Sequence, residues 1–441
     1  MKIAIIGAGG RVGLPFSILS ADAGHNVLGF DINKNTVNML NNGIMPFEEE
    51  GAEPLLKKYT KTNMFSRTKL HFTTDSILDY IDEKFDMFIY ILGTPVDSEG
   101  NPVLDDLIKE FRVLKKYIDD NNKNDSDSYS PTIILRSTVA PGTTETLNKI
   151  LKGTNTFPRF CGNYSLYYIP ERVLQGKSLT ETVQHDWIVG EPIMPETTTT
   201  PKIDVFMNSL GIQNQHRVSW KEAEIGKLMT NMWRYMNFAF ANEMYMIGDH
   251  YDVDIHNVIN SFNSNYPRLD VALPGPNVGG PCLFKDGKFL TQHIPFADLI
   301  DVSFQINEGM PEYVANKITQ TPIENVLILG GTFKANCDDI RNSLSFKLVK
   351  CLKRRGITSY IRDPYFDYSK YILKTKGEII TEPEQYDSIV LMTPHDEYDN
   401  KYIEDLIEFG DNISDEVTFL DIWKKTDIAY TNPDGFWQRK K

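Results

Sequence analysis

One cysteine lies in a glycine- and proline-rich stretch and has the surroundings of a nucleophile. The stretch runs from Gly275 to Asp286 and reads Gly-Pro-Asn-Val-Gly-Gly-Pro-Cys-Leu-Phe-Lys-Asp. Glycines before Cys282 let the backbone and a ligand come close to the sulfur. If a helix begins near Cys282, its free N–H groups favour the thiolate, and Asp286 four residues later shares the same helix face. The alternative is a small buried apolar side chain, as most free cysteines are.

A lysine and an asparagine are predicted on one long helix. From residue 220 to residue 251 the sequence has no proline, and only two glycines interrupt its helical register. Lys227 and Asn231 are four residues apart and therefore share a face of that helix. Helix geometry alone favours the alternative that Lys227 is a solvated surface charge. The helix is longer than a typical globular helix, which makes it a candidate for connecting domains and for dimerisation.

The N-terminal stretch has the pattern of a dinucleotide-binding β-α-β unit. Residues 2–6 form an apolar run typical of a strand buried on both faces, and a glycine turn, a helix to about residue 24 and a second strand follow. Asp31 ends this second strand, where an acid bonds the ribose hydroxyls and repels a 2′-phosphate, so the predicted cofactor is NAD rather than NADP. The predicted cofactor contacts here are Gly7, Gly9, Gly10, Arg11, Val12, Gly13 and Asp31.

The spacing of these glycines departs from the common G-x-G-x-x-G pattern. Counting from Gly7 puts the third glycine position on Val12, and counting back from Gly13 puts the first on Ala8. The count indicates one inserted residue in the loop, which alters the geometry expected around a pyrophosphate.

Further buried strands are predicted at residues 85–92, 132–136 and 167–169. Each ends in polar or turn-forming residues, at the edge of an open α/β sheet where ligands bind. Ordinary turn chemistry, with Ser and Thr as helix caps, is the alternative. The residues at these strand ends are Thr94, Pro95, Ser137, Thr138, Glu171 and Arg172.

Composition places the chain among ordinary globular proteins with two or three domains. Its 441 residues are 41% apolar and 24% charged, and the net charge of -14 argues against a nucleic-acid partner. Four widely spaced cysteines without a CxxC pair and eight unclustered histidines suggest neither a metal site nor a disulfide framework. No apolar run is long enough to span a bilayer, and the apolar N-terminus is too short and glycine-broken for a signal peptide. We therefore expect a reducing, cytoplasmic location without a membrane partner.

A second series of β-α-β patterns begins at about residue 325 and has no G-x-G-x-x-G. Such a module binds something other than a dinucleotide, for example a single nucleotide. The predicted fold is therefore α/β, with two Rossmann-like doubly wound domains joined by a central helical segment that contains the long helix. We place the NAD-binding domain at residues 1–218, the central segment at 219–320 and the nucleotide-binding domain at 321–441.

The motifs and their order resemble those of the UDP-glucose/GDP-mannose dehydrogenase family over nearly the whole chain. Members of that family oxidise the C6 alcohol of a nucleotide sugar to a carboxylate with two NAD. The resemblance adds Thr94, Pro95, Ser137 and Thr138 to the expected cofactor contacts. The matching motifs are Val-Gly-Leu-Pro at 12–15, Gly-Thr-Pro at 93–95, Ser-Thr-Val-Ala-Pro-Gly-Thr-Thr at 137–144, Pro-Glu-Arg at 170–172, Lys227 with Asn231, Gly-Gly-Pro-Cys at 279–282, Lys-Asp at 285–286, Phe-Lys at 333–334, Asp-Asp-Ile-Arg-Asn-Ser at 338–343, Asp-Pro at 363–364 and Thr-Pro-His at 393–395.

The resemblance also implies a covalent mechanism. Cys282 would capture the intermediate aldehyde as a thiohemiacetal, which is then oxidised to a thioester. Lys227 and Asn231 would stabilise oxyanion charge during both oxidations. Asp286 would hold a water that removes protons.

Water activation and substrate binding are implied at further positions. Thr138 and Glu171 would position and activate the water that hydrolyses the thioester. In the family, the loop before the cysteine, here residues 273–280, holds the UDP. An arginine reaches the phosphosugar, often across a dimer. The third domain adds further cations to the UDP pocket. Surface charges with ordinary ion pairs are the alternative for these cations. The implied substrate contacts are Glu171, Arg172, Lys227, Asn231, Arg268, Leu273, Gly275, Gly279, Lys334 and Arg341.

The run at residues 170–177 bears on the identity of the sugar. At Gln175 the UDP-glucose branch usually carries a second glutamate, and the run looks more like that of the UDP-N-acetylhexosamine branch. The expected substrate is UDP-N-acetylglucosamine or UDP-N-acetylmannosamine, with UDP-glucose as the alternative, and the expected assembly is a homodimer or higher homo-oligomer. Two other hypotheses are a two-electron hydroxyacid dehydrogenase, which needs no Cys282 and no second α/β module, and a non-catalytic nucleotide-sugar sensor, which has no need of the whole catalytic set.

Overall fold

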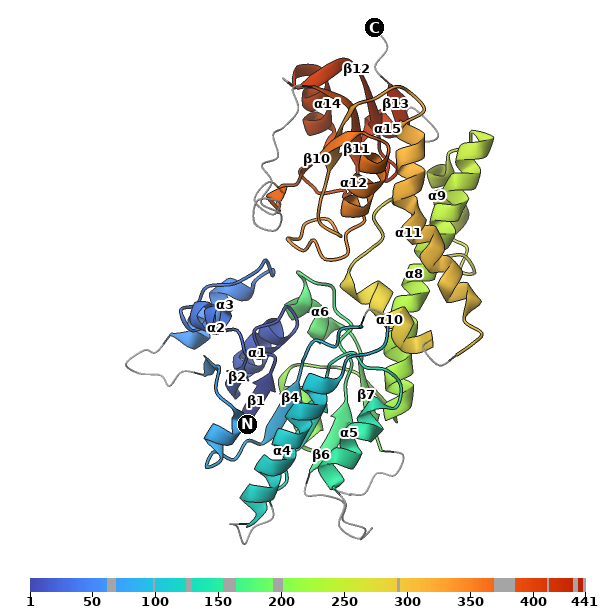
Figure 1. Ribbon diagram of the computed structural model, residues 1–441. Coiled ribbons are helices and arrows are strands. Elements are labelled where there is room, and N and C mark those ends of the chain that lie inside the picture. Colours follow the sequence, from blue (N-terminus) through green and yellow to red (C-terminus); the bar gives the residue numbers. More distant parts are fainter. Residues whose placement is uncertain are drawn as a thin grey trace. The chain divides into compact units, whose positions relative to one another are not determined.

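The chain divides into two compact units (Figure 1). Unit 1 consists of Met1–Thr230 and Lys288–His293, and unit 2 of Asn231–Gly287 and Ile294–Lys441. The division falls inside the long helix, so the segment expected at 219–320 contributes to both units. The computed structural model describes residues 1–61, 69–97, 100–123, 129–153, 164–192, 201–291, 294–368, 385–410, 412–430 and 435–438.

Unit 1 is built on an eight-stranded sheet in the order β3-β2-β1-β4-β5-β6-β7-β8, in which only β6 and β7 pair antiparallel. β1 has β2 on one side and β4 on the other, so the strand order reverses there, and ligands bind outside the carboxyl ends of strands at such a point. This order confirms the predicted Rossmann-like domain. The strands are β1 (Lys2–Ile6), β2 (Asn26–Phe30), β3 (Leu70–Thr73), β4 (Met87–Tyr90), β5 (Thr132–Leu135), β6 (Ser165–Tyr168), β7 (Trp187–Glu191) and β8 (Gln215–Ser219).

The sheet of unit 1 is buried on both faces, as its continuous apolar strands predict. Ile3 and Ile5 of β1 belong to one hydrophobic cluster, and Ala4 and Ile6 belong to the other, because successive side chains of a strand point to opposite faces. Helices pack on both faces and complete a doubly wound domain. The helices are α1 (Gly13–Asp22), α2 (Lys34–Asn41), α3 (Ala52–Thr60), η1 (Ile77–Tyr80), α4 (Asp105–Lys123), α5 (Thr143–Lys152), α6 (Ser178–Gln184) and α7 (Lys202–Ser209).

The long helix expected from the sequence is α8 (Trp220–Tyr251), with the predicted bounds. It begins in unit 1 and ends in unit 2. In unit 2 it packs against α11 (Asp298–Ile318), where the rings of Tyr235 and Phe304 lie 4.8 Å apart and Lys317 pairs with Asp249 at 2.6 Å. The two shorter helices of this region are α9 (Ile255–Asn263) and α10 (Pro281–Thr291).

A five-stranded sheet in the order β10-β9-β11-β12-β13 forms the C-terminal module of unit 2. Its first four strands are parallel and β13 is antiparallel, which confirms the second α/β module. Here too alternate residues of an interior strand, β9, belong to separate hydrophobic clusters. The elements are β9 (Asn325–Leu329), α12 (Ser345–Arg354), β10 (Thr358–Arg362), β11 (Tyr386–Leu391), α14 (Asn400–Phe409), β12 (Ile413–Leu420), α15 (Asp427–Tyr430) and β13 (Phe436–Gln438).

Candidate active site

The turn after β1 shows which of its glycines the fold requires. Cβ atoms on Gly7, Gly9 and Gly13 would lie 2.3, 2.8 and 2.1 Å from neighbouring atoms, closer than side chains normally come. Gly7 also has a φ of +86°, in the left-handed region. Gly10 has room for a side chain, since the nearest atom would be 3.6 Å away. The inserted residue therefore lies between the second and third close-approach glycines, Gly9 and Gly13.

Asp31 lies beside this turn, at the carboxyl end of β2. Its Oδ2 accepts a 2.9 Å hydrogen bond from the N–H of Gly9, and its Oδ1 accepts one from the N–H of Asn33. A carboxylate has about four acceptor positions, so Asp31 can fix the turn and still bind a ribose hydroxyl. Val12 offers no side-chain cap to α1, whose first N–H groups suit the negative charge of a pyrophosphate. The residues present thus fit a dinucleotide.

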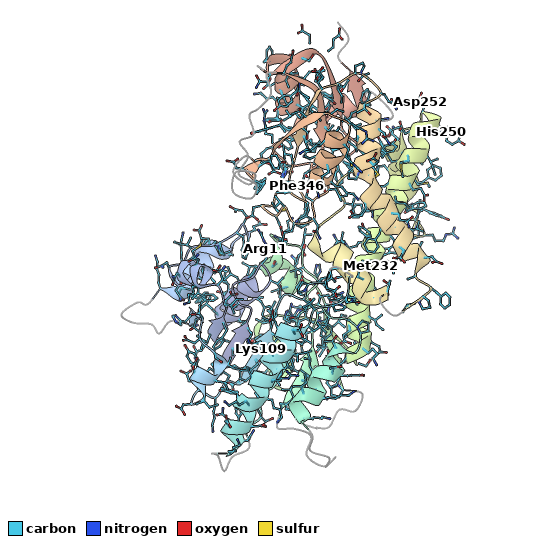
Figure 2. The ribbon with its side chains drawn as sticks, viewed as in Figure 1. Arg11, Lys109, Met232, His250, Asp252 and Phe346 are labelled. Carbon is cyan, nitrogen blue, oxygen red and sulfur yellow. The ribbon has the colours of Figure 1, made fainter. Side chains whose placement is uncertain are left out.

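Arg11 of the glycine turn, labelled in Figure 2, contacts the loop that follows β6. Its guanidinium lies 5.1 Å from the centroid of the Phe47 ring. When the carboxamide of Gln175 is oriented with its oxygen toward Arg11, this oxygen accepts from Nη1 of Arg11 at 2.6 Å and from Nε at 3.0 Å. Gln175 stands where the UDP-glucose branch usually has glutamate. It contacts Arg11 of the glycine turn, whose spacing differs from G-x-G-x-x-G.

The turns after β4 and β5 are hydrogen-bonded to each other. Thr94 donates from Oγ1 to the carbonyl of Thr138 at 2.5 Å, and Oγ of Ser137 accepts from the N–H of Leu92 at 2.8 Å. Thr94 and Ser137 are buried, Thr138 is half-buried, and Pro95 is exposed. These bonds fix the backbone of Thr138, the residue expected to position water.

Glu224 of α8 holds the turn that follows Thr138. Its buried carboxylate accepts from the N–H of Gly142 at 2.6 Å, from the N–H of Thr144 at 2.8 Å and from the hydroxyl of Thr144 at 2.6 Å. The carboxylate thereby caps the N-terminus of α5, where negative charge is favoured. Burial raises the pKa of Glu224, and these hydrogen bonds oppose the shift. The sequence pattern did not single out Glu224, although an acid one turn before Lys227 is a usable signal.

Lys227 is only 8% exposed, so it is not the solvated surface charge that helix geometry alone favours. Within the described part of the chain, no carboxylate lies within ion-pair distance of its ammonium group. A buried ammonium without a counter-charge is costly, and functional sites are where proteins keep such groups.

Glu171 follows β6, which neighbours β5, so Glu171 and Thr138 lie at the same edge of the sheet. Its Oε1 accepts from the N–H of Val173, which fixes the carboxylate against its own loop. Arg172, an expected substrate contact, donates to the carbonyl of Asp186. Its guanidinium is therefore at least partly used to hold this loop to the start of β7.

A buried arginine, which the sequence pattern did not reveal, lies directly before Ser137. Arg136 is 4% exposed and its guanidinium lies 4.3 Å from the ring centroid of Phe16 and 4.9 Å from that of Trp187. Burial lowers the pKa of Arg136 to about 10, and the negative charge of Glu171 opposes the shift. Arg136 thus places a positive charge beneath the strand ends that carry Thr138 and Glu171.

In unit 2, α10 begins at Pro281, so Cys282 lies in the first turn of a helix, which meets the condition for a stabilised thiolate. The free N–H groups of that turn favour a thiolate. The side chain of Cys282 lies outside the described part of the chain. Asp286, one turn further along, is 1% exposed, and its Oδ2 accepts a 2.6 Å hydrogen bond from Asn231 of α8, which is 7% exposed. The structure therefore brings Asn231 and Asp286 together.

The loop before Cys282 lies closely against the C-terminal module. A Cβ on Gly275 would lie 2.2 Å from the ring of Trp423, and one on Gly279 would lie 2.5 Å from the carbonyl oxygen of Asn342. Both glycines, expected as substrate contacts, are therefore required by this close approach.

Asn277, in the middle of the same loop, is the main polar anchor and was not predicted. Its Nδ2 lies 2.9 Å from both the carbonyl of Thr332 and Oγ1 of Thr393, and its Oδ1 accepts from the N–H of Leu344 at 2.8 Å. The side chain is 3% exposed. A buried polar group with partners on three segments fixes the loop relative to the C-terminal module.

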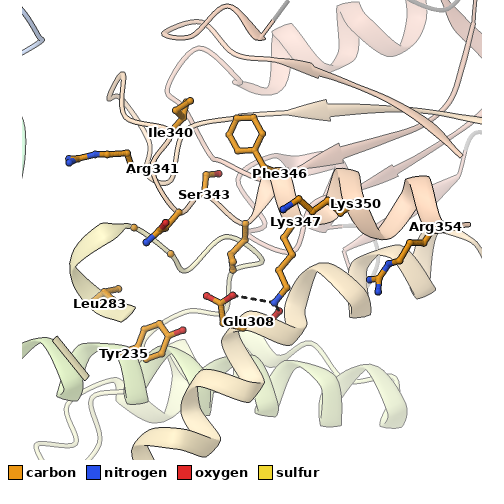
Figure 3. A pocket seen from close by; sticks show the side chains of 14 residues that line it. Tyr235, Leu283, Glu308, Ile340, Arg341, Ser343, Phe346, Lys347, Lys350 and Arg354 are labelled. Atoms are coloured by element: carbon orange, nitrogen blue, oxygen red, sulfur yellow. Dashed lines mark hydrogen bonds and ion pairs between the residues drawn. The ribbon is translucent and has the colours of Figure 1, made fainter. Parts of the chain in front are cut away.

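A cavity of about 940 Å³ lies in unit 2 beside this loop (Figure 3). Its lining includes glycines of the cysteine loop, Tyr235 of α8 and one face of α12. Arg341 lines it and is oriented by Asp339, with Nη2 2.7 Å from Oδ2 and Nε 2.9 Å from Oδ1. The charged lining is mostly basic and suits an anion such as a diphosphate; it consists of Arg341, Lys347, Lys350, Arg354 and one acid, Glu308.

The remaining expected substrate contacts lie elsewhere in unit 2. Arg268 is exposed, and its guanidinium lies 4.8 Å from the ring centroid of Tyr266. Leu273 is 39% exposed. Lys334 is half-buried and lies in the connection that joins β9 to α12. These three do not belong to the described lining of the cavity, whereas Gly279 and Arg341 do.

Neither a metal cluster nor a membrane-spanning helix occurs in the described ranges. No three His, Cys, Asp or Glu side chains there come together as a metal ion would require. None of the described helices is both long and apolar enough to cross a membrane.

Family models match most of the chain. The NAD binding domain of the UDP-glucose/GDP-mannose dehydrogenase family matches residues 1–203, its central domain residues 221–308 and its UDP binding domain residues 327–427. These matches confirm the resemblance seen in the motifs and the NAD cofactor.

Three similar proteins each cover at least 90% of the chain. A UDP-N-acetyl-D-mannosamine dehydrogenase of Methanococcus maripaludis is 30% identical, over 96% of this chain and 95% of its own. The solved structure of a UDP-D-ManNAc dehydrogenase from Pyrococcus horikoshii has a TM-score of 0.74 and 28% identity, over 90% of each chain. That of a UDP-N-acetyl-mannosamine dehydrogenase from Staphylococcus aureus has a TM-score of 0.75 and 25% identity, over 97% of this chain and 95% of its own. The chain therefore belongs to the UDP-glucose/GDP-mannose dehydrogenase family and is an NAD-dependent oxidoreductase of nucleotide sugars.

Proposed function

We propose that the enzyme oxidises the C6 hydroxyl of a UDP-N-acetylhexosamine to a carboxylate through a covalent intermediate on Cys282. The observation that carries this proposal is the buried ammonium of Lys227, which has no carboxylate partner among the described residues. An alkoxide or tetrahedral oxyanion, the charge that develops in both oxidations, would be its counter-charge. A purely structural lysine at this depth would need a partner of its own.

The proposed chemistry balances with two hydride acceptors and one water. Bound NAD supplies a hydride acceptor for each of the two oxidations. The thiolate of Cys282 adds to the carbon of the aldehyde that the first oxidation leaves, and the second oxidation turns this thiohemiacetal into a thioester. Water then cleaves the thioester to the carboxylate and the free thiol. The position of Cys282 in the first turn of α10 supports the thiolate form.

The other polar residues would move protons and hold water. Asp286, fixed by Asn231, keeps acceptor positions for a water that takes the proton released in each oxidation. Glu171 and Thr138 lie at one sheet edge and would hold the hydrolytic water between a base and a hydroxyl. Asp31 and the N-terminus of α1 would hold the ribose and pyrophosphate of NAD.

The choice of an N-acetylhexosamine rests on two observations. The relatives reported above are named for UDP-N-acetylmannosamine. Gln175 stands where a UDP-glucose enzyme usually has glutamate, and it contacts Arg11 of the cofactor turn. A glutamate there would pair with Arg11 and change the charge beside the cofactor. UDP-glucose is the alternative substrate.

The yield of NADH per sugar tests both the reaction and the substrate. Purified enzyme with excess NAD receives limiting UDP-N-acetylmannosamine, UDP-N-acetylglucosamine or UDP-glucose in separate reactions. Two NADH per sugar from one N-acetylhexosamine is the expected result. One NADH per sugar would show that the reaction ends at the aldehyde and would remove the role of Cys282. Two NADH from UDP-glucose alone would transfer the assignment to that sugar.

We further propose a homodimer formed along α8. Trp233, Phe240 and Ile247 recur every seven residues on this helix and are 59%, 48% and 44% exposed. A stripe with this spacing faces one side of a helix, and a second copy of the same helix would cover it. Sedimentation should give twice the mass of the chain, and Trp233→Glu should shift the protein toward the monomer. A wild-type monomer at tens of micromolar would contradict the proposal.

A further inference from the structure

The segment from Asp270 to Gly275 has neither helix nor strand, yet side-chain amides hold its backbone. Asn263, the last residue of α9, donates to the carbonyl of Val271 at 2.8 Å and accepts from the N–H of Val271 at 3.1 Å. One side chain thus binds both polar groups of one residue, as a neighbouring strand would.

Asn237 of α8 repeats this arrangement on the flanking residues. Its Nδ2 donates to the carbonyl of Asp270 at 2.8 Å, and its Oδ1 accepts from the N–H of Ala272 at 2.8 Å. Two asparagines from different helices therefore bind all four polar groups of two consecutive peptide units, and no described strand pairs with this segment.

A third asparagine fixes the end of the segment. The N–H of Gly275 donates to Oδ1 of Asn242 at 2.9 Å. Nδ2 of Asn242 donates to Oδ1 of Asn307 at 2.9 Å, and Nδ2 of Asn307 donates to the carbonyl of Tyr235 at 3.0 Å. Asn242 and Asn307 are fully buried, so this relay ties the segment to the packed core between α8 and α11.

The asparagines act on the part of the chain that leads into the cysteine loop. The segment overlaps the start of the loop 273–280, which contributes Gly279 and Gly280 to the cavity in unit 2. Ordering one residue of a free coil costs about 1–2 kcal/mol, which a ligand must supply if the loop is not already ordered. Five side-chain to backbone hydrogen bonds order this coil before any ligand arrives.

We propose that Asn237 and Asn263 are positioning residues that preorganise the segment 270–275 for the nucleotide end of the substrate. The inference rests on the proposed function, because it takes the cavity lined by Gly279 and Gly280, which follow this segment in the chain, as the UDP-sugar site. Loss of either asparagine leaves the reacting groups in place and lowers the fraction of enzyme with a binding-competent loop. The apparent affinity for the nucleotide falls by that fraction, while the rate of the bound complex does not.

Kinetics of four variants test the proposal. We expect Asn237→Ala and Asn263→Ala each to raise KM for the UDP-sugar about 10-fold, the effect of losing one well-formed pair of hydrogen bonds, with kcat and KM for NAD within about twofold of wild type. Asn263→Asp keeps the acceptor for the N–H of Val271 and loses the donor, so it should fall between wild type and Asn263→Ala. Asn260→Ala, an exposed asparagine of the same helix α9, is the matched control and should behave as wild type.

Two measurements without turnover accompany the kinetics. Calorimetry with UDP should show the same weakening as KM. Hydrogen exchange of a peptide covering residues 270–275 should be slow in the wild type and faster in both alanine variants, because the N–H groups of Val271 and Ala272 lose their acceptors.

Several outcomes would overturn the proposal. These are wild-type KM and UDP affinity in the folded alanine variants, an equal rise in KM for NAD, or fast exchange of the segment already in the wild type. If Asn263→Ala does not fold, wild-type KM in Asn263→Asp decides against the proposal. Absence of NADH from every nucleotide sugar in the wild type refutes the proposed function instead, while UDP calorimetry and exchange still decide the preorganisation.

Discussion

The amide of Asn231 donates a 2.6 Å hydrogen bond to the carboxylate of Asp286, although the two residues are far apart in the chain. Both are buried, on helices α8 and α10, and α10 also carries Cys282. The bond sets the direction of the Asp286 carboxylate, so the residue expected to hold the proton-accepting water is aligned by a residue expected to stabilise oxyanions.

Replacing Asp286 by asparagine separates its charge from its position. Asp286→Asn keeps an oxygen that accepts from Asn231, so the hydrogen bond and the melting temperature should change little. The carboxylate that holds the proton-accepting water loses its charge, and we expect kcat to fall about 10²–10⁴-fold. Steady-state kinetics and thermal melting check this. A variant with nearly normal kcat would show that Asp286 is only structural.

We expect the buried charge of Lys227 to lower the stability of the folded protein and to be required for activity. Lys227→Met keeps the apolar stem and removes a buried charge without a described carboxylate partner, so the melting temperature should stay the same or rise. The loss of a positive charge from the oxyanion site should lower kcat about 10²–10³-fold. Thermal melting and steady-state kinetics on the same preparation test the expected melting temperature and the expected loss of kcat. A less stable but fully active variant would refute the assigned role.

Cys282→Ser should stop the reaction before the acid. The hydroxyl is a far weaker nucleophile than a thiolate in the same helix turn, so no thioester forms. Acid formation, followed by chromatography of the sugar product, should be abolished. Cys351→Ala, which changes a buried cysteine of α12, is the control and should still yield two NADH per sugar. Normal acid formation by Cys282→Ser would rule out the covalent mechanism.

Glu224→Gln tests the link between α8 and the turn after Thr138. A glutamine offers one acceptor oxygen, and its NH₂ group would face the N–H of Gly142 or Thr144. We expect a loss of about 1–3 kcal/mol in the free energy of unfolding and a lower kcat, since the turn loosens. Urea unfolding and kinetics measure both. Glu243→Gln, at an exposed position of the same helix, should leave both unchanged, and equal effects at the two positions would refute the link.

Asp421 should make stability depend on pH. Burial raises its pKa from 3.8 to about 6, although Thr426 donates two hydrogen bonds to it. The folded chain therefore binds more protons than the unfolded chain between these values, so the free energy of unfolding falls as pH rises from about 4 to 6 and is level above. Asp421→Asn removes this ionisation and still accepts from Thr426. It should be up to about 3 kcal/mol more stable than wild type at pH 8 and no more stable at pH 4.

Urea unfolding of both proteins at pH 4, 6 and 8 measures the dependence on Asp421. A difference between them that is the same at all three pH values would show that Asp421 does not titrate in this window.

Much of the fold could be predicted because it is encoded locally. The apolar run 2–6, the glycine turn and Asp31 indicate a parallel strand, a helix start and a ribose contact from neighbouring residues alone, and the structure has β1, α1 and β2 there. The long helix at 220–251 was predicted with its bounds because no proline breaks its register.

The sequence by itself determined the motif residues and their order, and with them the family, since those residues are read directly and need no partner. Tertiary structure decided what depends on contacts between distant segments. It showed that Gly10 is free of close contacts, that Lys227 is buried, and that Glu224, Asn277 and the asparagines of α8 and α9 hold the loops of the site. An asparagine or glutamate in a sequence has many possible partners, and only the packing of helices and loops selects one.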